Sequence, residues 1–305
     1  MKATLLLLCL LQSGCVLATL PSSKYTVRAV DAETGLPVTN AVIRTGFDHQ
    51  YDPWGNKPSI VDLRKEHVNE KGEVTFKGKD RKGGAGGTVF AEGYYTGHKG
   101  QGSKLNAVLN RWEPWNPTIT VKLRPKKDPV PMVYKRIELK KIPKKQIKIG
   151  FDLEKGDWVA PYGKGKIADF IFIPNWYSFD PIKGSEGSYK LVFSNPDDGI
   201  QEYEFPKNLD SSFKWAYVAP TNNYSNILEQ KSVWTKTGRL KKGYKNCNYI
   251  FRVRSKRNKK GKIISACYGR IKGPIDVGPY GKFNMEYWFN PNPKSRSLES
   301  KNKPY

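Results

Sequence analysis

The sequence predicts an all-β chain with two sandwich-like domains. Three observations lead to this prediction: strand-sized apolar alternations recur along the chain, turn residues separate them, and no segment has a convincing helical period. The 28 Gly and 21 Pro supply many turns without the regular spacing of a fibrous protein. At about 150 residues per domain, 305 residues suggest two domains. A hydrophobic fraction of 38% and an aromatic fraction of 12% can fill two cores and argue against disorder.

Residues 1–18 have the composition of a secretory signal peptide. Lys2 precedes a short apolar run over residues 5–11, and small residues precede Thr19. That run is far shorter than the roughly 20 residues of a membrane-spanning helix. We therefore expect a secreted, periplasmic or cell-envelope protein that is cleaved before Thr19. A bacterial lipoprotein is the alternative, because residues 13–15 resemble a lipobox with Cys15 as the lipidated residue, although residue 12 is Gln where Leu is usual.

The first domain is expected over residues 19–125. Turn chemistry at residues 31–35 and 69–72 separates short alternating segments. The predicted strands are residues 25–30, 41–44, 73–76, 88–91 and 118–123. Short strands joined by such turns favour a β-sandwich over βαβ units.

Four short sequence segments of this domain resemble segments of carboxypeptidase regulatory-like domains. They are VDAETGLPV at residues 30–38, NEKGEVTF at 69–76, AEGYY at 91–95 and ITVKL at 119–123. The resemblance implies a transthyretin-like sandwich of seven strands with a non-catalytic accessory role, and it implies no active site. The chain departs from the family pattern by a loop over residues 47–66 and a glycine-rich run at 83–87. Residues 110–117 and 150–165 resemble a group of exported bacterial proteins of unassigned function.

A basic, proline-containing linker is expected over residues 126–148, with an edge strand at 133–137. A second, larger β domain follows over residues 149–293. Its predicted strands are residues 169–173, 189–194, 200–205, 213–218, a hairpin over 247–267, and 284–289. Only residues 224–233 could form a short helix. Residues 294–305 are predicted to be a loose polar tail.

The sequence contains no recognisable enzyme template. His49, His67 and His98 are the only histidines, and their spacing is not that of a metal site. Residues 184–188 are not a nucleophile elbow, and residues 163–166 lack the frame of a phosphate-binding loop. We therefore expect a protein that is not an enzyme, with no catalytic residue, metal or cofactor. The alternative is a hydrolase or lyase acting on polysaccharides, which would use Asp152, Asp157 or Asp169 in an aromatic-lined cleft.

Charge points to a polyanionic partner. The formal net charge is +25, and removal of Lys2 with the leader leaves 25 − 1 = +24. The cations concentrate on one predicted hairpin and the segment before it. The candidate polyanion-binding residues are Arg239, Lys241, Lys242, Arg252, Arg254, Lys256, Arg257, Lys259 and Lys260. Strand alternation would put Arg252 and Arg254 on one face.

For an exported protein, the expected partner is an acidic polysaccharide or another envelope component. Nucleic acid is not an expected partner, and a membrane would be contacted only through a lipid on Cys15. Two alternatives stay open. The charge could serve only to keep the protein soluble, or the protein could be a structural module that docks on another surface protein through an apolar patch.

Tryptophans in turn-rich segments could stack on sugar rings. Trp54, Trp112 and Trp115 are the candidates, because prolines interrupt their surroundings. The tryptophans near predicted strands are expected in the core instead. These are Trp158, Trp176, Trp215 and Trp288.

Cys247 and Cys267 are the two cysteines that remain beyond the leader. In an oxidising compartment two cysteines favour one disulfide. They flank a predicted hairpin with its turn at residues 258–261, which would not put them directly opposite each other. A bond would therefore need a bulge or another register, and two buried thiols are the alternative.

Overall fold

The computed structural model describes residues 20–49, 61–144, 146–176, 185–235, 238–240, 247–278 and 281–302. These residues form strands, turns and bends without any helix, which confirms the prediction of an all-β chain built from β-sandwich domains. Within these ranges there is accordingly no helix of the length and hydropathy that crossing a membrane requires. Residues 1–18, predicted to be a signal peptide, lie outside the described residues.

The chain divides into two compact units. The first unit comprises residues up to Lys126 together with Lys207–Lys214, and the second comprises 127–206 and the residues from Trp215 on. The segment predicted as a linker therefore belongs mostly to the second unit. Its expected edge strand is present as β10, Val133–Lys141, at the edge of a sheet.

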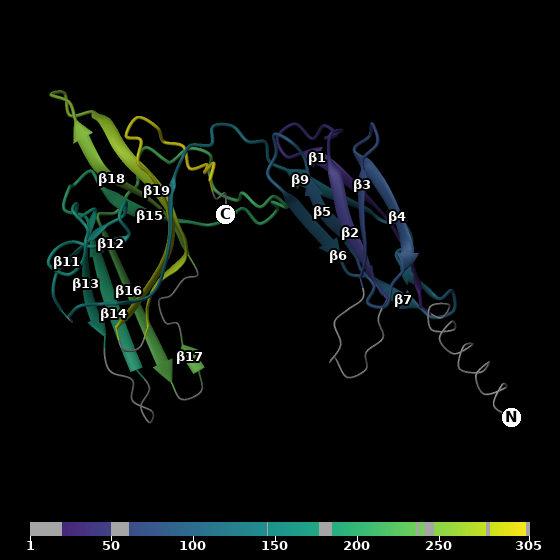
Figure 1. The fold of residues 1–305 in the computed structure, drawn as a ribbon, viewed down its shortest axis with the longest axis horizontal. Helices are drawn as coiled ribbons and strands as arrows, with labels where there is room; N and C mark the ends of the chain where they lie inside the picture. The colour runs from purple at the N-terminus through teal and green to yellow at the C-terminus, as the bar shows by residue number, and fades with distance from the viewer. Residues whose placement is uncertain are drawn as a thin grey trace. The chain divides into compact units, whose positions relative to one another are not determined.

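The first unit contains two facing sheets (Figure 1). One sheet has the order β4-β1-β8-β7 with β9 paired to β1, and the other has the order β3-β2-β5-β6. The strands are β1 Ser22–Asp31, β2 Val42–Asp48, β3 Val61–His67, β4 Glu73–Lys79, β5 Ala85–Phe90, β6 Gly97–Gln101, β7 Lys104–Asn106, β8 Arg111–Glu113 and β9 Thr118–Leu123.

Alternation along the central strands builds the core of this unit. Tyr25, Val27 and Ala29 of β1 are buried, and so are Ile119 and Val121 of β9, which pairs with β1 in parallel. Successive side chains of a strand point to opposite faces, so these residues line one side of the sheet. They form a single apolar cluster with buried residues of the other sheet.

A segment from far along the chain completes the first unit. His98 of β6 donates its backbone N–H to the carbonyl of Asp210 at 2.9 Å. The ring of Phe213 stacks on Tyr95 with centroids 4.6 Å apart, and the guanidinium of Arg124 lies 5.0 Å from its centre. Residues 207–214 therefore cover the edge strand β6, which otherwise would present unpaired backbone groups.

The second unit also contains two sheets, of order β10-β20-β19-β18-β15 and β12-β11-β13-β14-β16-β17. Its remaining strands are β11 Ile149–Asp152, β12 Asp157–Trp158, β13 Phe170–Trp176, β14 Ser185–Val192, β15 Gly199–Tyr203, β16 Ile227–Thr235, β17 Gly238–Leu240, β18 Asn248–Arg257, β19 Ile263–Gly278 and β20 Lys282–Asn290.

Aromatic rings from both sheets fill the second core. Phe151, Trp158, Phe172 and Phe283 are fully or almost fully buried, and their ring centroids lie 5.1–5.8 Å apart in the contacting pairs. Tilted and edge-on contacts at this separation suit the charge distribution of aromatic rings. Of the four tryptophans expected in the core, Trp158, Trp215 and Trp288 are confirmed, and the side chain of Trp176 lies outside what the structure describes.

Three expectations about the second unit were wrong. Residues 224–233, considered for a helix, contain most of the strand β16 instead. Residues 213–218 form no continuous strand, and only Val218 makes an isolated bridge, to Ser297. The third wrong expectation is the loose tail over residues 294–305, because residues 297–300 are buried.

Residues near the carboxyl end are packed into the second unit. Leu298 is fully buried, and Glu299 is 1% exposed. The carboxylate of Glu299 accepts the backbone N–H groups of Lys127 and Asp128 at 3.1 and 2.7 Å. The polar composition of the segment did not predict this burial. Its buried polar groups are satisfied by hydrogen bonds to backbone groups.

Candidate functional site

The basic hairpin β18–β19 forms as the sequence predicted, with its turn at residues 258–262. The side-chain oxygen of Asn258 accepts the backbone N–H groups of Lys260 and Lys262, each at 3.0 Å. Gly261 has a φ of 77°, a left-handed conformation that glycine adopts without strain. The turn therefore fixes a short loop that carries several lysines.

Arg252 lies inside the protein. It is 7% exposed, and its guanidinium donates to the carbonyls of Asp197 and Thr221 at 2.6 and 2.7 Å. The guanidinium also lies 4.5 Å from the ring centre of Tyr224. Arg252 thus joins the hairpin to neighbouring loops and is not presented at the surface.

Arg254 lies in a bulge that breaks the expected alternation. The register of β18 against β19 shifts after Val253, and Arg254 has a φ of 58°. Its guanidinium lies 5.0 Å from the ring centre of Phe289, a core residue. Arg252 and Arg254 therefore have different surroundings, and they do not form the single cationic row that the sequence predicted.

Arg254 binds three carboxylates. Its Nε and Nη1 atoms donate to Asp169 and Glu154 at 2.7 and 2.8 Å, and Nη2 lies 3.6 Å from Asp152. Burial by itself would lower the pKa of Arg254, but the hydrogen bonds to Asp169 and Glu154 outweigh it and raise that pKa. The guanidinium ties the hairpin to the end of β11, to the loop that follows it and to the residue before β13.

Arg257 pairs with Asp197 in the turn before β15. Both guanidinium Nε and Nη2 donate to the two carboxylate oxygens of Asp197. This pair holds the pKa of Asp197 below its ordinary value, against a smaller opposing effect of burial. Arg257 also donates to the carbonyl of Gly261 at 2.6 Å, which braces the turn.

The carboxylates proposed for catalysis in the enzyme alternative are all engaged. Asp152 and Asp169 do lie close to each other, but every oxygen of the two carboxylates accepts a hydrogen bond. Asp152 Oδ1 accepts the N–H groups of Glu154 and Lys155, and Oδ2 accepts those of Lys166 and Ile167. Asp169 Oδ1 accepts from Arg254, and Oδ2 accepts from Arg254 and the backbone of Leu153.

These environments shift the two pKa values in opposite directions. Burial would raise the pKa of Asp152, but its backbone N–H partners outweigh burial and lower it. For Asp169, burial dominates and raises the pKa, although Arg254 opposes the shift. Asp157, the third candidate, pairs with Lys140 Nζ at 2.6 Å and accepts the N–H groups of Trp158 and Lys164.

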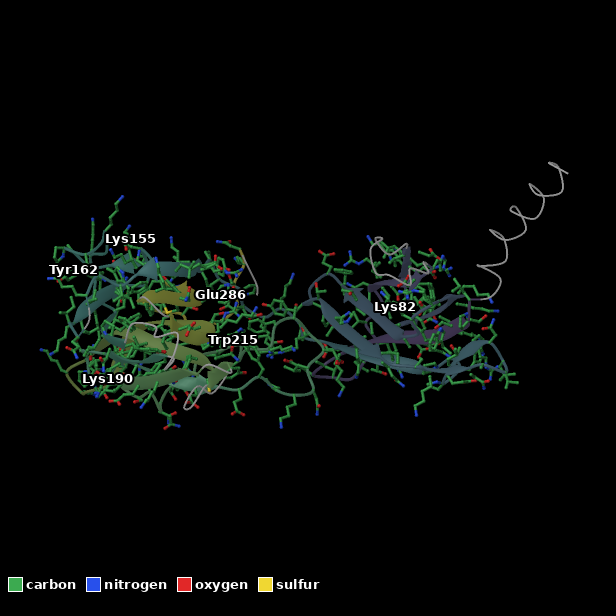
Figure 2. The ribbon with its side chains drawn as sticks, turned by 90° about the horizontal axis from the view of Figure 1, so that it is seen from below. Lys82, Lys155, Tyr162, Lys190, Trp215 and Glu286 are labelled. Atoms are coloured by element: carbon green, nitrogen blue, oxygen red, sulfur yellow. The ribbon has the colours of Figure 1, made fainter. Side chains whose placement is uncertain are left out.

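Four hairpin lysines remain exposed. Within the described ranges, no acidic side chain pairs with them. They are Lys256, Lys259, Lys260 and Lys262. The segments before and after β12, which supply the Arg254 partners Glu154 and Asp169, add the exposed side chains of Lys155, Lys164 and Lys166, of which Lys155 is labelled in Figure 2. The arginines of this region bind protein groups, whereas these lysines face solvent.

The side chains of five predicted site residues lie outside what the structure describes. Trp54, Lys241 and Lys242 lie outside the described residues, as does Cys15. The backbone of Arg239 belongs to β17 and pairs with Trp234. The predicted patch can therefore be followed only on the hairpin itself, from Arg252 to Lys260.

Trp112 and Trp115 are half-buried. The indole Nε1 of Trp112 donates to the carbonyl of Asp80 at 2.7 Å, and a Cβ placed on Gly83 would lie 2.4 Å from its ring. The guanidinium of Arg111 lies 5.1 Å from the ring centre of Trp115. Both rings thus contact protein groups in the first unit.

Cys247 and Cys267 are buried and are not joined by a disulfide, which corrects the expected bond. Cys267 lies opposite Val253, six residues along β18 from Cys247. At about 3.3 Å per residue, this offset far exceeds the reach of a disulfide. The bulge after Val253 does not bring the two thiols together. Burial raises the pKa of the Cys267 thiol to about 11.

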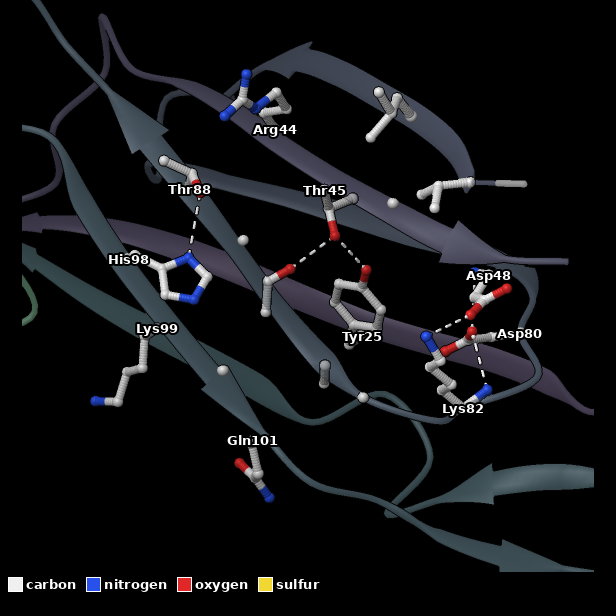
Figure 3. Close-up of a pocket in the computed structure, with 18 residues that line it drawn as sticks. Tyr25, Arg44, Thr45, Asp48, Asp80, Lys82, Thr88, His98, Lys99 and Gln101 are labelled. Atoms are coloured by element: carbon white, nitrogen blue, oxygen red, sulfur yellow. Dashed lines mark hydrogen bonds and ion pairs between the residues drawn. The ribbon is translucent and has the colours of Figure 1, made fainter. Parts of the chain in front are cut away.

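A cleft in the first unit was missed by the sequence analysis. It has a volume of about 470 Å³ and lies along β2, β5 and β6 (Figure 3). Arg44, Thr88 and His98 line it together with glycines from all three strands. The glycine-rich run at 83–87 is the sequence signal for this cleft, because Gly84, Gly86 and Gly87 line it, but glycines alone do not identify the strands that come to lie beside them.

No His, Cys, Asp and Glu side chains gather as a metal-binding group in the described part of the chain. No family model matches the chain, and no curated protein matches it. Among solved structures, the chain is similar to a DUF3823 family protein from Parabacteroides merdae. The identity is 9% and the TM-score 0.20, over 88% of this chain and 98% of that chain.

A second solved structure is a "putative membrane-associated protein of unknown function" from Bacteroides fragilis. It shares 12% identity at a TM-score of 0.16, over 88% of this chain and 96% of that chain. At these TM-scores, neither likeness carries a conclusion about the fold or the function of this chain.

Proposed function

We propose that the protein is an exported, non-enzymatic binding protein of the cell envelope or its surroundings, and that its second unit binds an acidic polysaccharide. The exposed lysines of the hairpin tip supply the binding surface. In this proposal the first unit is an accessory sandwich of the carboxypeptidase regulatory-like type. The export signal at residues 1–18 directs the chain out of the cytosol.

One observation carries the proposal: the arginines of the hairpin bind protein groups, whereas its lysines are exposed to solvent. Arg252, Arg254 and Arg257 bind carbonyls and carboxylates of the protein, which stiffens the hairpin. Its four exposed lysines have no acidic partner within the described ranges. Flexible ammonium groups on a rigid support suit a polymer with repeated negative charges, because binding releases the counterions of the polymer.

The test measures retention of the mature chain on immobilised polygalacturonate. Replacing the four hairpin lysines with Gln (K256Q, K259Q, K260Q and K262Q) should lower the salt concentration needed for elution. The dependence of affinity on salt should also become shallower, since fewer counterions are released. Circular dichroism and a thermal melt establish that the variant remains folded.

A matched control removes the same charge elsewhere. Lys71, Lys77, Lys104 and Lys122 are exposed lysines of the first unit. Their replacement with Gln should change elution much less than replacement of the hairpin set. Equal shifts for the two sets would mean that net charge alone causes retention, and the hairpin assignment would then be abandoned.

A further inference from the structure

The cleft of the first unit lies in the sheet β3-β2-β5-β6. Its residues are far in sequence from the basic hairpin β18–β19. Its volume of about 470 Å³ is in the range of small-ligand sites. Strands β2 and β5 pair over only three residues of each, from Val42 to Arg44 with Thr88 to Phe90. Beyond Arg44 the ladder of β2 continues with β3 alone. The cleft therefore opens where the central ladder ends.

A polar row crosses three strands at one end of the cleft. The register puts Arg44 of β2 opposite Thr88 of β5, and Thr88 opposite His98 of β6. Directly opposite residues share a face of the sheet, so a guanidinium, a hydroxyl and an imidazole stand side by side. Thr88 Oγ1 lies 3.2 Å from His98 Nδ1, as the dashed line in Figure 3 marks.

Charge in the cleft is unevenly neutralised. At the other end, Asp48 pairs with Lys82 at 2.9 Å, and the Asp80 carboxylate accepts the N–H of Asp48 at 3.0 Å. Lys99 lies 3.6 Å from Asp210. Arg44 is exposed, and in the described ranges it contacts the ring of Phe90 at 5.4 Å but no carboxylate. An anionic group of a ligand would therefore be attracted to Arg44.

The floor beside this row is built from glycines of β2, β5 and β6 together with the side chains of Tyr25 and Thr45. Gly46 of β2 lies two residues beyond Arg44, and Gly86 of β5 lies opposite Gly100 of β6. Glycine inside strands weakens a sheet and often marks a place where a ligand approaches the backbone. Val61 and Leu63 of β3 border the floor and are 43% and 71% exposed. A Cβ added to Gly46 would lie 2.5 Å from Cγ1 of Val61, so Val61 covers Gly46 and the apolar surface offered to a ring is that of Val61 and Leu63.

We propose that the cleft binds a sugar unit that carries a carboxylate. Arg44 donates two parallel hydrogen bonds to the carboxylate, which the planar guanidinium fits better than a single ammonium does. The Thr88 hydroxyl and the backbone groups of the glycine floor bond the sugar hydroxyls. This site is independent of the proposed hairpin function, because it uses only residues of the first unit.

The test is calorimetric titration of the mature chain at physiological salt, in a background with the four hairpin lysines replaced by Gln. The probes are trigalacturonate, its neutral methyl ester and inorganic phosphate. Trigalacturonate should bind, and the ester and phosphate should bind at least about tenfold more weakly. Equal binding of the ester, or of phosphate, would overturn a site for carboxylated sugars.

Two matched pairs of variants locate the site. R44Q should weaken trigalacturonate binding at least about tenfold, whereas K77Q, which removes one charge of another strand, should not. Gly100→Phe fills the cleft, since only the carbonyl of Ala85 lies within 4 Å of an added Cβ, at 3.9 Å. Gly102 has no atom within 4 Å and does not line the cleft, so Gly102→Phe is its control. Unchanged binding in R44Q or in Gly100→Phe, with folding retained, would overturn the proposal.

Discussion

The arginines and the lysines of the basic hairpin have different roles: the arginines hold its structure, and the lysines form its exposed surface. Arginine offers five N–H donors in a rigid plane, so Arg252, Arg254 and Arg257 can each satisfy several protein acceptors at once. Lysine offers a compact, well-hydrated charge and stays in solvent here. A list of cations in the sequence does not distinguish these roles, because the distinction depends on carboxylates that are remote in sequence. Arg254 and Asp169, for example, are 85 residues apart.

Asp152 gives a prediction about pH. Although burial opposes it, the N–H groups around Asp152 lower its pKa in the folded protein. An Asp whose pKa falls on folding adds stability above its unfolded pKa of about 3.9, and that stability is lost as pH falls through the folded pKa. Asp152→Asn should therefore lower the free energy of unfolding by about 2 kcal/mol at pH 7.

The difference between this variant and the native chain should shrink at pH 3, because pH 3 lies below the unfolded pKa of about 3.9 and the stabilisation is lost as the pH falls toward the lower folded pKa. Urea unfolding followed by near-ultraviolet circular dichroism at the two pH values measures it. Glu70→Gln, at an exposed position, serves as the control. An equal loss of stability at both pH values would contradict the assignment of the shift to the Asp152 carboxylate.

Among the elements, the sequence predicted those strands in which apolar and polar residues alternate clearly. The strand predicted at residues 118–123 is β9 with the same bounds, and the predicted turn after β18 carries the expected Asn and Gly. Residues 224–233 were the one segment expected to form a short helix, and pairing with β14 makes most of them a strand. Local propensity is overridden there by a partner that the sequence pattern does not identify.

The bulge at Arg254 and the segment 207–214 were beyond prediction for a related reason. A one-residue shift in register moves a side chain to the other face, and no residue pattern near Arg254 announces it. Likewise, Asp210 and Phe213 accept hydrogen bonds from Lys122 and Arg124, more than 80 residues earlier in the chain. The cleft residues Arg44, Thr88 and His98 became neighbours only through the sheet register.

Phe213 gives a prediction about an element. The side chain is fully buried against Tyr95, so Phe213→Ala should detach the segment from β6. The cost of such a truncation is about 3–5 kcal/mol. Hydrogen exchange of the His98 N–H, which donates to Asp210, should accelerate by about two orders of magnitude or more.

Exchange at Val27, in the central strand β1, should change much less than at His98. Leu109→Ala is the control, because Leu109 is 52% exposed. If exchange at His98 were unchanged in Phe213→Ala, the segment would not protect the edge of β6 in solution.

At the scale of the whole molecule, composition and period predicted two β-sandwich domains, and the division of strands into two sets of sheets follows that prediction. The buried positions of Leu298 and Glu299 could not be predicted from composition, because a polar segment with backbone partners resembles a free tail. Charge predicted a class of partner, which stays a proposal.

Export gives a prediction about the entire chain. Material isolated from its native source should have a mass that begins at Thr19, because residues 16–18 fit the rule for cleavage. A lipid on Cys15 would instead support the lipoprotein alternative. Intact mass spectrometry of fractionated cells measures both. Recovery from the cytosol with residues 1–18 attached would contradict export.

The segment 207–214 also constrains how this protein can be recombined. Its eight residues complete the first sandwich, yet they are encoded within the stretch that builds the second. A fusion or a gene exchange made at residue 126 would transfer the amino-terminal sandwich without the piece that covers its edge. The two halves are therefore expected to pass between genes together, and a transplant of the amino-terminal half would need these eight residues grafted back.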